Sequence, residues 1–140
     1  MPDDGPMTTT NPPTVWPCLT YNDAGAAIKF LTEVFGFEER ATYARDDDPS
    51  VVEHTELQWP LGGGIMFGTA AKDDSPFGKR ITGNDAVYVV CDNPDALFTR
   101  ATSAGAEVVR ALADEDYGSR GFTVRDPEGN LWTFGTYKGE

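Results

Sequence analysis

The sequence predicts an α+β fold made of two tandem βαβββ modules. Two segments of the chain share one order of features: β-branched and aromatic residues, an acidic residue, an apolar helical stripe and a glycine. Asp23 recurs as Asp92 and Gly36 recurs as Gly105, both at an interval of 69 residues. Self-similarity at a fixed period indicates a structural unit that is used twice.

Module 1 is expected at about residues 15–71 and opens with a strand rich in β-branched and aromatic residues. Asp23 marks the start of a helix, because a carboxylate there accepts hydrogen bonds from unpaired backbone amides. Apolar residues then recur at intervals of three and four up to Phe35, which is typical of an amphipathic helix. Gly36 favours a left-handed residue at the helix end. Three strands are predicted to follow, at Glu39–Arg45, Val51–Trp59 and Gly64–Thr69.

Module 2 is expected at about residues 84–137 and repeats this order. Its helix starts near Asp92 and ends at Gly105. The stretch 126–130, Asp-Pro-Glu-Gly-Asn, is a strong turn signal between its last two strands. The predicted strands after the helix are Val108–Asp114, Gly121–Arg125 and Leu131–Tyr137.

Composition restricts the classes of partner. The 140 residues include 23 acidic and 11 basic side chains, so the formal net charge is −12 at pH 7. This charge repels polyanions and attracts cations, and phosphate binding needs clustered Lys and Arg, so we expect no nucleic-acid partner. No apolar run approaches the roughly 20 residues of a membrane helix, so we expect no membrane partner.

The N-terminal segment 1–14 is rich in Asp, Thr and Pro, and we expect a disordered leader ahead of a single domain at 15–140. The leader lacks the basic and apolar regions of a signal peptide. Two cysteines, Cys18 and Cys91, are too few for a disulfide framework. These features predict a cytoplasmic protein with reduced thiols.

Two motifs in this order are similar to those of a known family. The first consists of Asp23, Phe30 and the Phe-Gly-Phe triplet at 35–37, with Leu31 in place of the usual tyrosine. The second is the run 117–130 before the last strand, Tyr-Gly-Ser-Arg-Gly-Phe-Thr-Val-Arg-Asp-Pro-Glu-Gly-Asn. Together they resemble the vicinal oxygen chelate superfamily, nearest its bleomycin-resistance branch. The resemblance implies a curved mixed sheet that lines a cavity, helices on the outside, and a homodimer in which a partner completes each cavity.

Metal-dependent members of that family hold a divalent ion with His, Glu or Gln at four strand positions. Counting seven residues back from each helix aspartate gives Trp16 and Asp85, and the last strands contribute Met66 and Thr133. Only Asp85 has a side chain suited to such a site. We therefore expect no metal and no cofactor.

Strand alternation predicts which side chains face a cavity. On the first strand Trp16, Cys18 and Thr20 share one side; on the matching strand of module 2 Asp85, Val87 and Val89 do so, with Tyr88 and Val90 under the helix. The predicted ligand-binding set, extended by residues near strand ends, is Trp16, Cys18, Trp59, Met66, Asp85, Val87, Tyr117, Arg120 and Thr133. Its aromatic, thioether and carboxylate groups suit a planar, partly apolar guest. Three members have alternative roles, because Cys18 and Trp59 can be packing residues and Arg120 can hold a neighbouring carboxylate.

His54 is the only histidine of the chain and shares a strand face with Glu56. The pair can seed a displaced metal site or act as a proton shuttle. Two ligands are too few for a metal, and we prefer the interpretation as a solvated strand residue with acidic neighbours.

These features predict a metal-independent binding protein of the bleomycin-resistance type. It would sequester an aromatic or cationic natural product, as in antibiotic resistance or self-resistance, without changing it. The alternative is an enzyme of the glyoxalase or dioxygenase superfamily, a lyase or isomerase with a rebuilt active site. A third possibility is a partner-binding module, in which the cavity is filled by the protein's own side chains.

Overall fold

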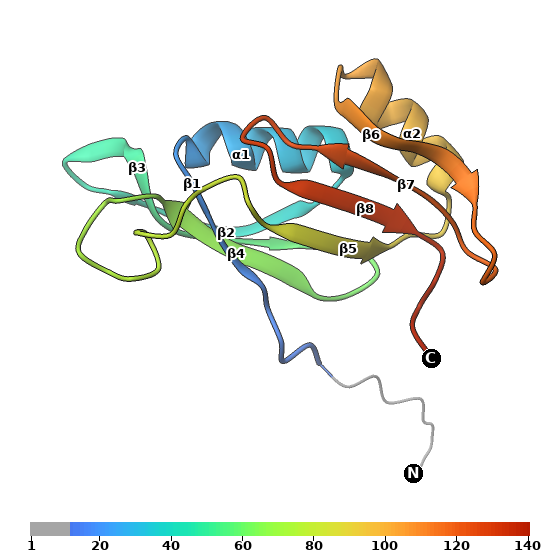
Figure 1. The fold of residues 1–140 in the computed structure, drawn as a ribbon. Helices are drawn as coiled ribbons and strands as arrows, with labels where there is room; N and C mark the ends of the chain where they lie inside the picture. Colours follow the sequence, from blue (N-terminus) through green and yellow to red (C-terminus); the bar gives the residue numbers. More distant parts are fainter. Residues whose placement is uncertain (1–11) are drawn as a thin grey trace, which may run out of the picture.

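Two four-stranded mixed sheets and two helical segments make up the computed structural model, which describes residues 12–140 (Figure 1). The predicted leader therefore lies almost entirely outside the described residues. The first module contains β1 (Cys18–Tyr21), α1 (Ala24–Phe30), the π-helical turn η1 (Leu31–Phe35), β2 (Glu38–Arg45), β3 (Asp48–Gln58) and β4 (Gly64–Thr69). The second contains β5 (Ala86–Val90), α2 (Pro94–Ser103), β6 (Glu107–Asp114), β7 (Arg120–Arg125) and β8 (Leu131–Gly135). The α+β prediction with two βαβββ modules is confirmed.

The two sheets have the same topology. The strand order is β1-β4-β3-β2 in the first sheet and β5-β8-β7-β6 in the second. The pairs β1–β4 and β5–β8 are parallel, and the remaining neighbours are antiparallel. Consequently β1 and β5, the strands that open each module, are both terminal strands of their sheets.

The two helical segments differ in length by one residue between the N-terminal cap and the glycine that follows. The predicted equivalence of Asp23 and Asp92 is therefore wrong. Asp23 caps α1, because its Oδ1 accepts a hydrogen bond from the amide of Ala26 at 3.0 Å. In module 2 the cap is Asn93, not Asp92. Both helical segments are followed by a glycine with positive φ, so the first module has one extra residue between cap and glycine. The wider turn η1 accommodates that residue.

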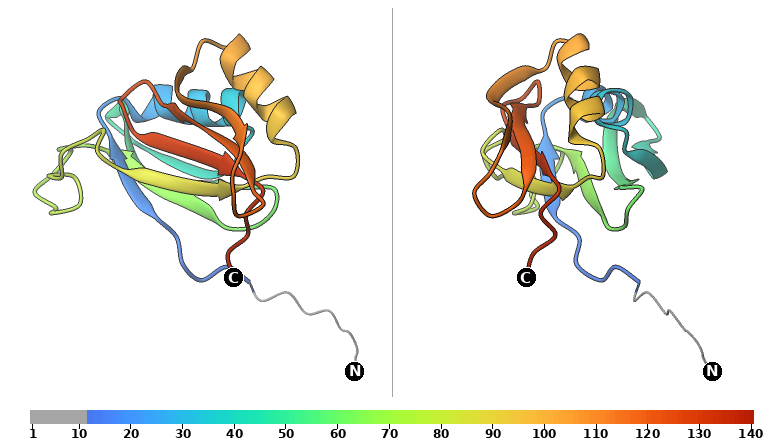
Figure 2. Two further views of the ribbon diagram at one scale, coloured as in Figure 1. Left: turned by 45° about the vertical axis from the view of Figure 1, so that its right-hand side comes forward. Right: turned by 90° about the vertical axis from the view of Figure 1, so that its right-hand side faces the viewer.

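One aromatic core joins the modules. Phe35 at the end of η1 packs edge-on against Phe134 of β8, with ring centroids 4.7 Å apart, and also meets Trp132 at 5.5 Å. Phe37 lies between Trp132 and Trp59, at 5.7 and 4.9 Å. Figure 2 shows α1 and α2 close together on the side where the modules meet, which leaves the other face of each sheet uncovered by helices.

The turn between β7 and β8 also holds the modules together. The Glu128 carboxylate accepts hydrogen bonds from the backbone amides of Asn22 and Asp23, both at 2.8 Å. Next to it, Tyr21 of β1 donates to the buried carboxylate of Asp126 at 2.7 Å. The predicted turn at 126–130 thus also fixes the entry into α1.

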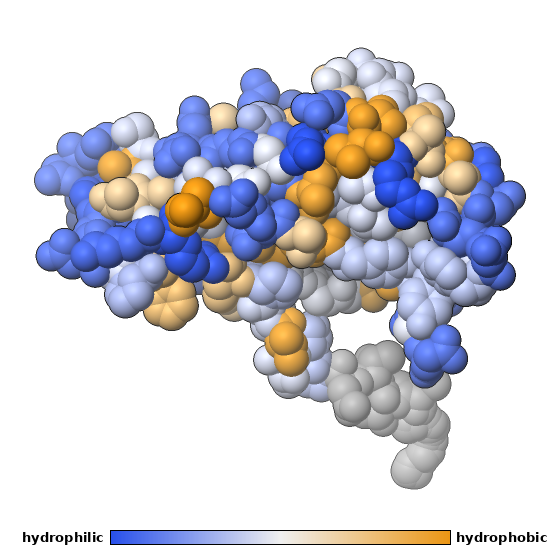
Figure 3. All heavy atoms as spheres, in the orientation of Figure 1, coloured by the Kyte–Doolittle hydropathy of each residue, from blue (hydrophilic) through white to orange (hydrophobic). Residues whose placement is uncertain are grey.

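Polar residues dominate the surface that is visible in Figure 3, where apolar side chains form separate small areas. This distribution agrees with the formal net charge of −12. Among the described residues, no helix is long and apolar enough to cross a membrane.

Candidate functional site

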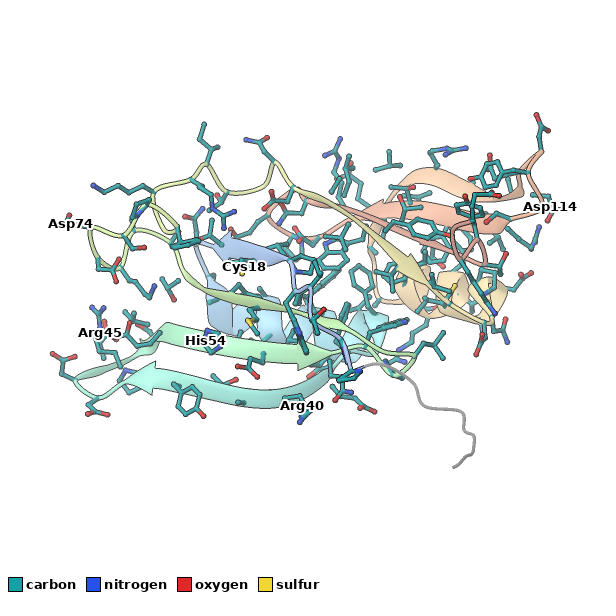
Figure 4. All side chains as sticks on the ribbon, turned by 90° about the horizontal axis from the view of Figure 1, so that it is seen from below. Cys18, Arg40, Arg45, His54, Asp74 and Asp114 are labelled. Carbon is teal, nitrogen blue, oxygen red and sulfur yellow. The ribbon has the colours of Figure 1, made fainter. Side chains whose placement is uncertain are left out.

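The uncovered face of the first sheet carries a row of three side chains with binding chemistry. Cys18 of β1 is paired with Met66 of β4, and Met66 is paired on its other side with Glu56 of β3. Paired residues point to the same side of a sheet, so these three lie on one face. His54 joins them, because it is two residues from Glu56 on the same strand. We call Cys18, His54, Glu56 and Met66 the first sheet face; Figure 4 shows Cys18 and His54 from this side.

His54 and Glu56 form a hydrogen-bonded pair on this face. The Nε2 atom of His54 lies 2.9 Å from Oε2 of Glu56, and the two side chains are 41% and 36% exposed. The sequence-based prediction that they share a face is confirmed. A histidine held by a carboxylate within reach of solvent can transfer a proton.

The second sheet carries the equivalent row, made of Tyr88, Thr133 and Thr123. Tyr88 of β5 is paired with Thr133 of β8, which is paired with Thr123 of β7. The two threonine hydroxyls are 2.8 Å apart and hydrogen-bonded to each other. We call Tyr88, Thr123 and Thr133 the second sheet face. It offers an aromatic ring and hydroxyl groups where the first sheet offers a thiol, a thioether and a carboxylate.

The predicted facing of β5 is wrong by one residue. Val87 is paired with Trp132 and Val89 with Phe134, so both valines lie on the core side of β5, where Val89 is buried and Val87 is partly buried against the core. Tyr88, predicted to lie under the helix, is 45% exposed on the opposite side. The error comes from counting back from Asp92 instead of from the true cap.

A hollow lies where the modules meet. A groove of about 600 Å³ runs between the turn that joins β3 to β4 and the strand β5, with Val15, Pro17 and Lys138 at its margin. We call it the junction groove. Trp59 and Val87 line it, and the indole N–H of Trp59 donates to the carbonyl of Val90 at 2.8 Å.

Trp16 lies beside the junction groove, at the turn from β3 to β4. Its ring covers Gly64, where a Cβ atom would be 2.5 Å from Cζ3 of the indole. Only glycine allows this close approach. Gly64 lines the groove together with Trp59 and Val87, so the Trp16 ring packs against a residue of the groove wall.

Two predicted residues lie apart from these surfaces. Arg120 donates to Asp95 at 2.8 and 3.1 Å and to Asp114 at 3.2 Å, which corresponds to its alternative role of holding carboxylates. These hydrogen bonds raise the pKa of Arg120, and the bond from Arg120 lowers the pKa of Asp95. Asp85 precedes β5, and its backbone amide donates to the side-chain oxygen of Asn130 at 2.9 Å.

Tyr117 adjoins the second sheet face. It lies near Tyr88, a member of that face, and near Tyr137, and neither of these two tyrosines is in the predicted site set. Its ring meets that of Tyr137 edge-on, with centroids 5.3 Å apart. Tyr88 donates to the backbone carbonyl of Tyr137 at 2.7 Å. Counting back from Asn93 would have identified Tyr88. Tyr137 was predicted as the last residue of the final strand, whereas β8 ends at Gly135; alternation from Thr133 would have assigned Tyr137 to the same face.

Comparison with known proteins identifies the family. Residues 14–134 match the model of the Glyoxalase/Bleomycin resistance protein/Dioxygenase superfamily. The chain belongs to this superfamily. Among solved structures, TioX from Micromonospora sp. ML1 superimposes with a TM-score of 0.73 at 28% identity, covering 89% of this chain and all of TioX. A glyoxalase I mutant from Zea mays gives a TM-score of 0.67 at 17% identity, over 87% of this chain and 44% of the maize chain, which shows a common fold.

Two curated relatives come from mycobacteria. The uncharacterized proteins Mb0911c of Mycobacterium bovis and Rv0887c of Mycobacterium tuberculosis are each 32% identical over 132 residues. The match covers 88% of this chain, and 82% and 74% of the two relatives.

The family's metal positions can now be assigned from the true helix caps. The positions seven residues before Asp23 and Asn93 are Trp16 and Ala86. Ala86 therefore takes the place of Asp85, which the sequence analysis had obtained by counting from Asp92. The last-strand positions are Met66 and Thr133. Neither an indole nor a methyl group binds a divalent ion, and Met and Thr are poor ligands for one. Within residues 12–140, no three His, Cys, Asp or Glu side chains gather closely enough to hold a metal ion. The four residues therefore do not fit the family's metal.

Proposed function

We propose that the protein is a metal-independent small-molecule binding protein of the bleomycin-resistance type, which sequesters an aromatic or cationic natural product and thereby provides antibiotic resistance or self-resistance. The observation that carries the proposal is the set Trp16, Met66, Ala86 and Thr133 at the family's four metal positions. Chemistry on oxyanions or enediolates requires a positive charge that stabilises the developing negative charge. These four side chains supply none.

The remaining surface chemistry supports the choice of ligand. Aromatic rings at Trp16, Trp59 and Tyr88 provide stacking area around the junction groove and the second sheet face. Met66 is flexible and polarisable, and it adapts to irregular guests. The net charge of −12 attracts cations from solution.

A homodimer is part of this proposal. The first and the second sheet face belong to different modules, and in a dimer the first sheet face of one copy can meet the second sheet face of the other. Both β1 and β5 are terminal strands, so each module has an edge that a second copy can approach. A partner would set its second sheet face against the first sheet face and enclose a ligand between them. We expect a dimer in sedimentation analysis of the purified protein.

A cytoplasmic location is also proposed. The two cysteines do not pair with each other: Cys18 is exposed and Cys91 is buried. Thiols in this state suit a reducing compartment. Fractionation of cells that express the full chain tests this expectation.

Metal-free bleomycin is a suitable first probe, because it combines planar aromatic rings with a cationic tail. We expect saturable quenching of tryptophan fluorescence, and the signal should come from Trp16 and Trp59 because Trp132 is fully buried. Excess EDTA should leave the affinity unchanged, and mass spectrometry should recover the compound unaltered after long incubation. Chemical conversion of bleomycin, or loss of binding in EDTA, would contradict the proposal, as would absence of quenching by bleomycin and by other planar cationic antibiotics.

One observation favours the enzyme alternative, namely the 2.9 Å contact between His54 and Glu56 beside Met66. This pair can act as a general acid and base in a lyase or isomerase. In that case His54→Ala would abolish product formation and leave ligand affinity nearly unchanged. The matched variant Phe77→Leu, an exposed side chain in the loop between β4 and β5, should retain turnover.

A further inference from the structure

Three tyrosines line a second hollow at the end of β8. Tyr88, Tyr117 and Tyr137, together with Glu140, surround a depression of about 440 Å³. We call the three tyrosines the tyrosine shelf. Tyr117 is 63% exposed and Tyr88 is 45% exposed, so their rings are accessible to a ligand.

The shelf is held in a fixed geometry by its own hydrogen bonds. The backbone carbonyl of Tyr137 accepts from the Tyr88 hydroxyl at 2.7 Å, and its amide donates to Ser119 Oγ at 3.1 Å. Gly135 makes this possible, because a Cβ at that position would lie 2.8 Å from the Tyr88 oxygen. Tyr88 and Tyr137 are therefore held in place before a ligand binds, and Tyr117 contacts the Tyr137 ring edge-on.

Two of the three hydroxyl groups are already engaged. Tyr88 donates to the Tyr137 carbonyl, and Tyr137 donates to the carboxylate of Glu140 at 3.1 Å. Burial raises the pKa of Tyr88, so its hydroxyl stays neutral at physiological pH. What these residues offer to a ligand is mainly the faces of their rings, which carry negative electrostatic potential.

Charges near the shelf are mostly negative. Glu140 lies in its lining, and Asp114, Glu115 and Asp116 directly precede Tyr117 in the chain. The nearby cation Arg110 is paired with Glu115 at 3.1 Å. Lys138, which follows Tyr137 in the chain, lines the junction groove.

We propose that the tyrosine shelf is a recognition site for an alkylated ammonium group, held by cation–π contacts with Tyr88, Tyr117 and Tyr137. Quaternary and methylated ammonium ions are bound in this way by groups of aromatic rings. The proposal rests on the proposed function in one respect, because it identifies the cationic part of the sequestered compound. A neutral group of the same shape gains only hydrophobic contact, and an anion is repelled by both ring faces and carboxylates.

Choline and 3,3-dimethylbutan-1-ol form a matched pair of probes, since the second has a neutral carbon atom where choline has its charged nitrogen. Titrations of the full chain, followed by NMR of tyrosine ring protons in 150 mM NaCl, should give choline at least about fivefold tighter binding. Salt at this level screens the general field of the acidic surface. Equal affinities for the two probes would overturn the proposal.

Two exposed tyrosines provide a matched comparison. Tyr117→Leu should abolish the preference for choline, whereas Tyr43→Leu should keep it, because Tyr43 is 62% exposed but lies on β2 of the other sheet. Tyr137→Phe should also retain the preference, since the ring remains. Equal losses in the Tyr117 and Tyr43 variants would mean unspecific attraction and would overturn the assignment. If the protein binds bleomycin but shows no preference for choline, the assignment of the tyrosine shelf as an ammonium site is wrong and the proposed function still holds.

Discussion

Asp126 is a buried carboxylate that accepts five hydrogen bonds. Its Oδ2 accepts from Tyr21, Asn130 and Trp132 at 2.7 to 3.0 Å, while Oδ1 accepts from two backbone amides of the same turn. The donors come from both modules, so this side chain connects β1 to β8. Each donor left without a partner in the interior costs about 1–3 kcal/mol.

We therefore predict that Asp126→Ala lowers the free energy of unfolding by about 3 kcal/mol or more. Urea denaturation followed by circular dichroism measures the change. Asp74→Ala is the control, because Asp74 is fully exposed and meets Lys79 only at 4.0 Å; its effect should stay within about 0.5 kcal/mol. Similar losses in the two variants would contradict the structural role of Asp126.

The two cysteines should differ in reactivity. Burial raises the pKa of the Cys91 thiol to about 11, whereas Cys18 is exposed on the first sheet face. At pH 8 iodoacetamide should modify Cys18 rapidly and Cys91 only after unfolding, because the thiolate is the reactive form. Peptide mass spectrometry over time separates the two sites, and equal rates in the folded protein would contradict the prediction.

The same shift has a consequence for stability. A raised pKa means that the folded state keeps the proton longer than the unfolded chain does. The contribution of the protonated Cys91 thiol to the free energy of unfolding is therefore complete below the thiol's ordinary pKa of 9.0, and it is lost as the pH rises through about 11. Burial also raises the pKa of Tyr21, which acts in the same direction at higher pH.

At the scale of elements, the sequence predicted the type and order of the helices and strands well. The prediction of which residues of β5 face the core failed, because the first module has one extra residue in η1. The predicted strands match β2 to β4 and β6 to β8 closely, because alternation and turn residues are local signals. A constant interval of 69 residues concealed the extra residue of η1, since Asp92 and Asn93 are both plausible caps. That single residue reversed the predicted facing of β5.

Gly36, at the end of η1, tests how strictly this helix end is specified. Its φ is +96°, and a Cβ would lie 3.1 Å from the guanidinium of Arg100. We expect Gly36→Ala to lower the free energy of unfolding by about 1 kcal/mol or more. A Cβ at Gly25 in α1 would make only an ordinary contact, 3.8 Å from Oδ1 of Asp23, so Gly25→Ala should instead stabilise the protein by about 0.5 kcal/mol. Thermal unfolding of both variants shows whether the signs are opposite, as the backbone geometry requires.

At the scale of the whole molecule, the predicted site residues divide among separate surfaces. Cys18 and Met66 lie on the first sheet face, Thr133 on the second with Tyr117 next to it, and Trp59 and Val87 in the junction groove. Periodicity assigns a residue to a face of its own strand, but it contains no information on how two modules pack. The proposed dimer would reunite the two sheet faces across copies.

Mixed dimers test this composite cavity directly. If each cavity combines the first sheet face of one chain with the second sheet face of another, Met66→Arg and Thr133→Arg each damage both cavities of their own homodimers. A mixed dimer then contains one doubly altered and one intact cavity. Random exchange of equal amounts makes half of the dimers mixed, so about a quarter of the wild-type binding capacity for bleomycin should return. Native mass spectrometry verifies the exchange; no recovery after verified exchange would mean that each chain builds its cavity alone.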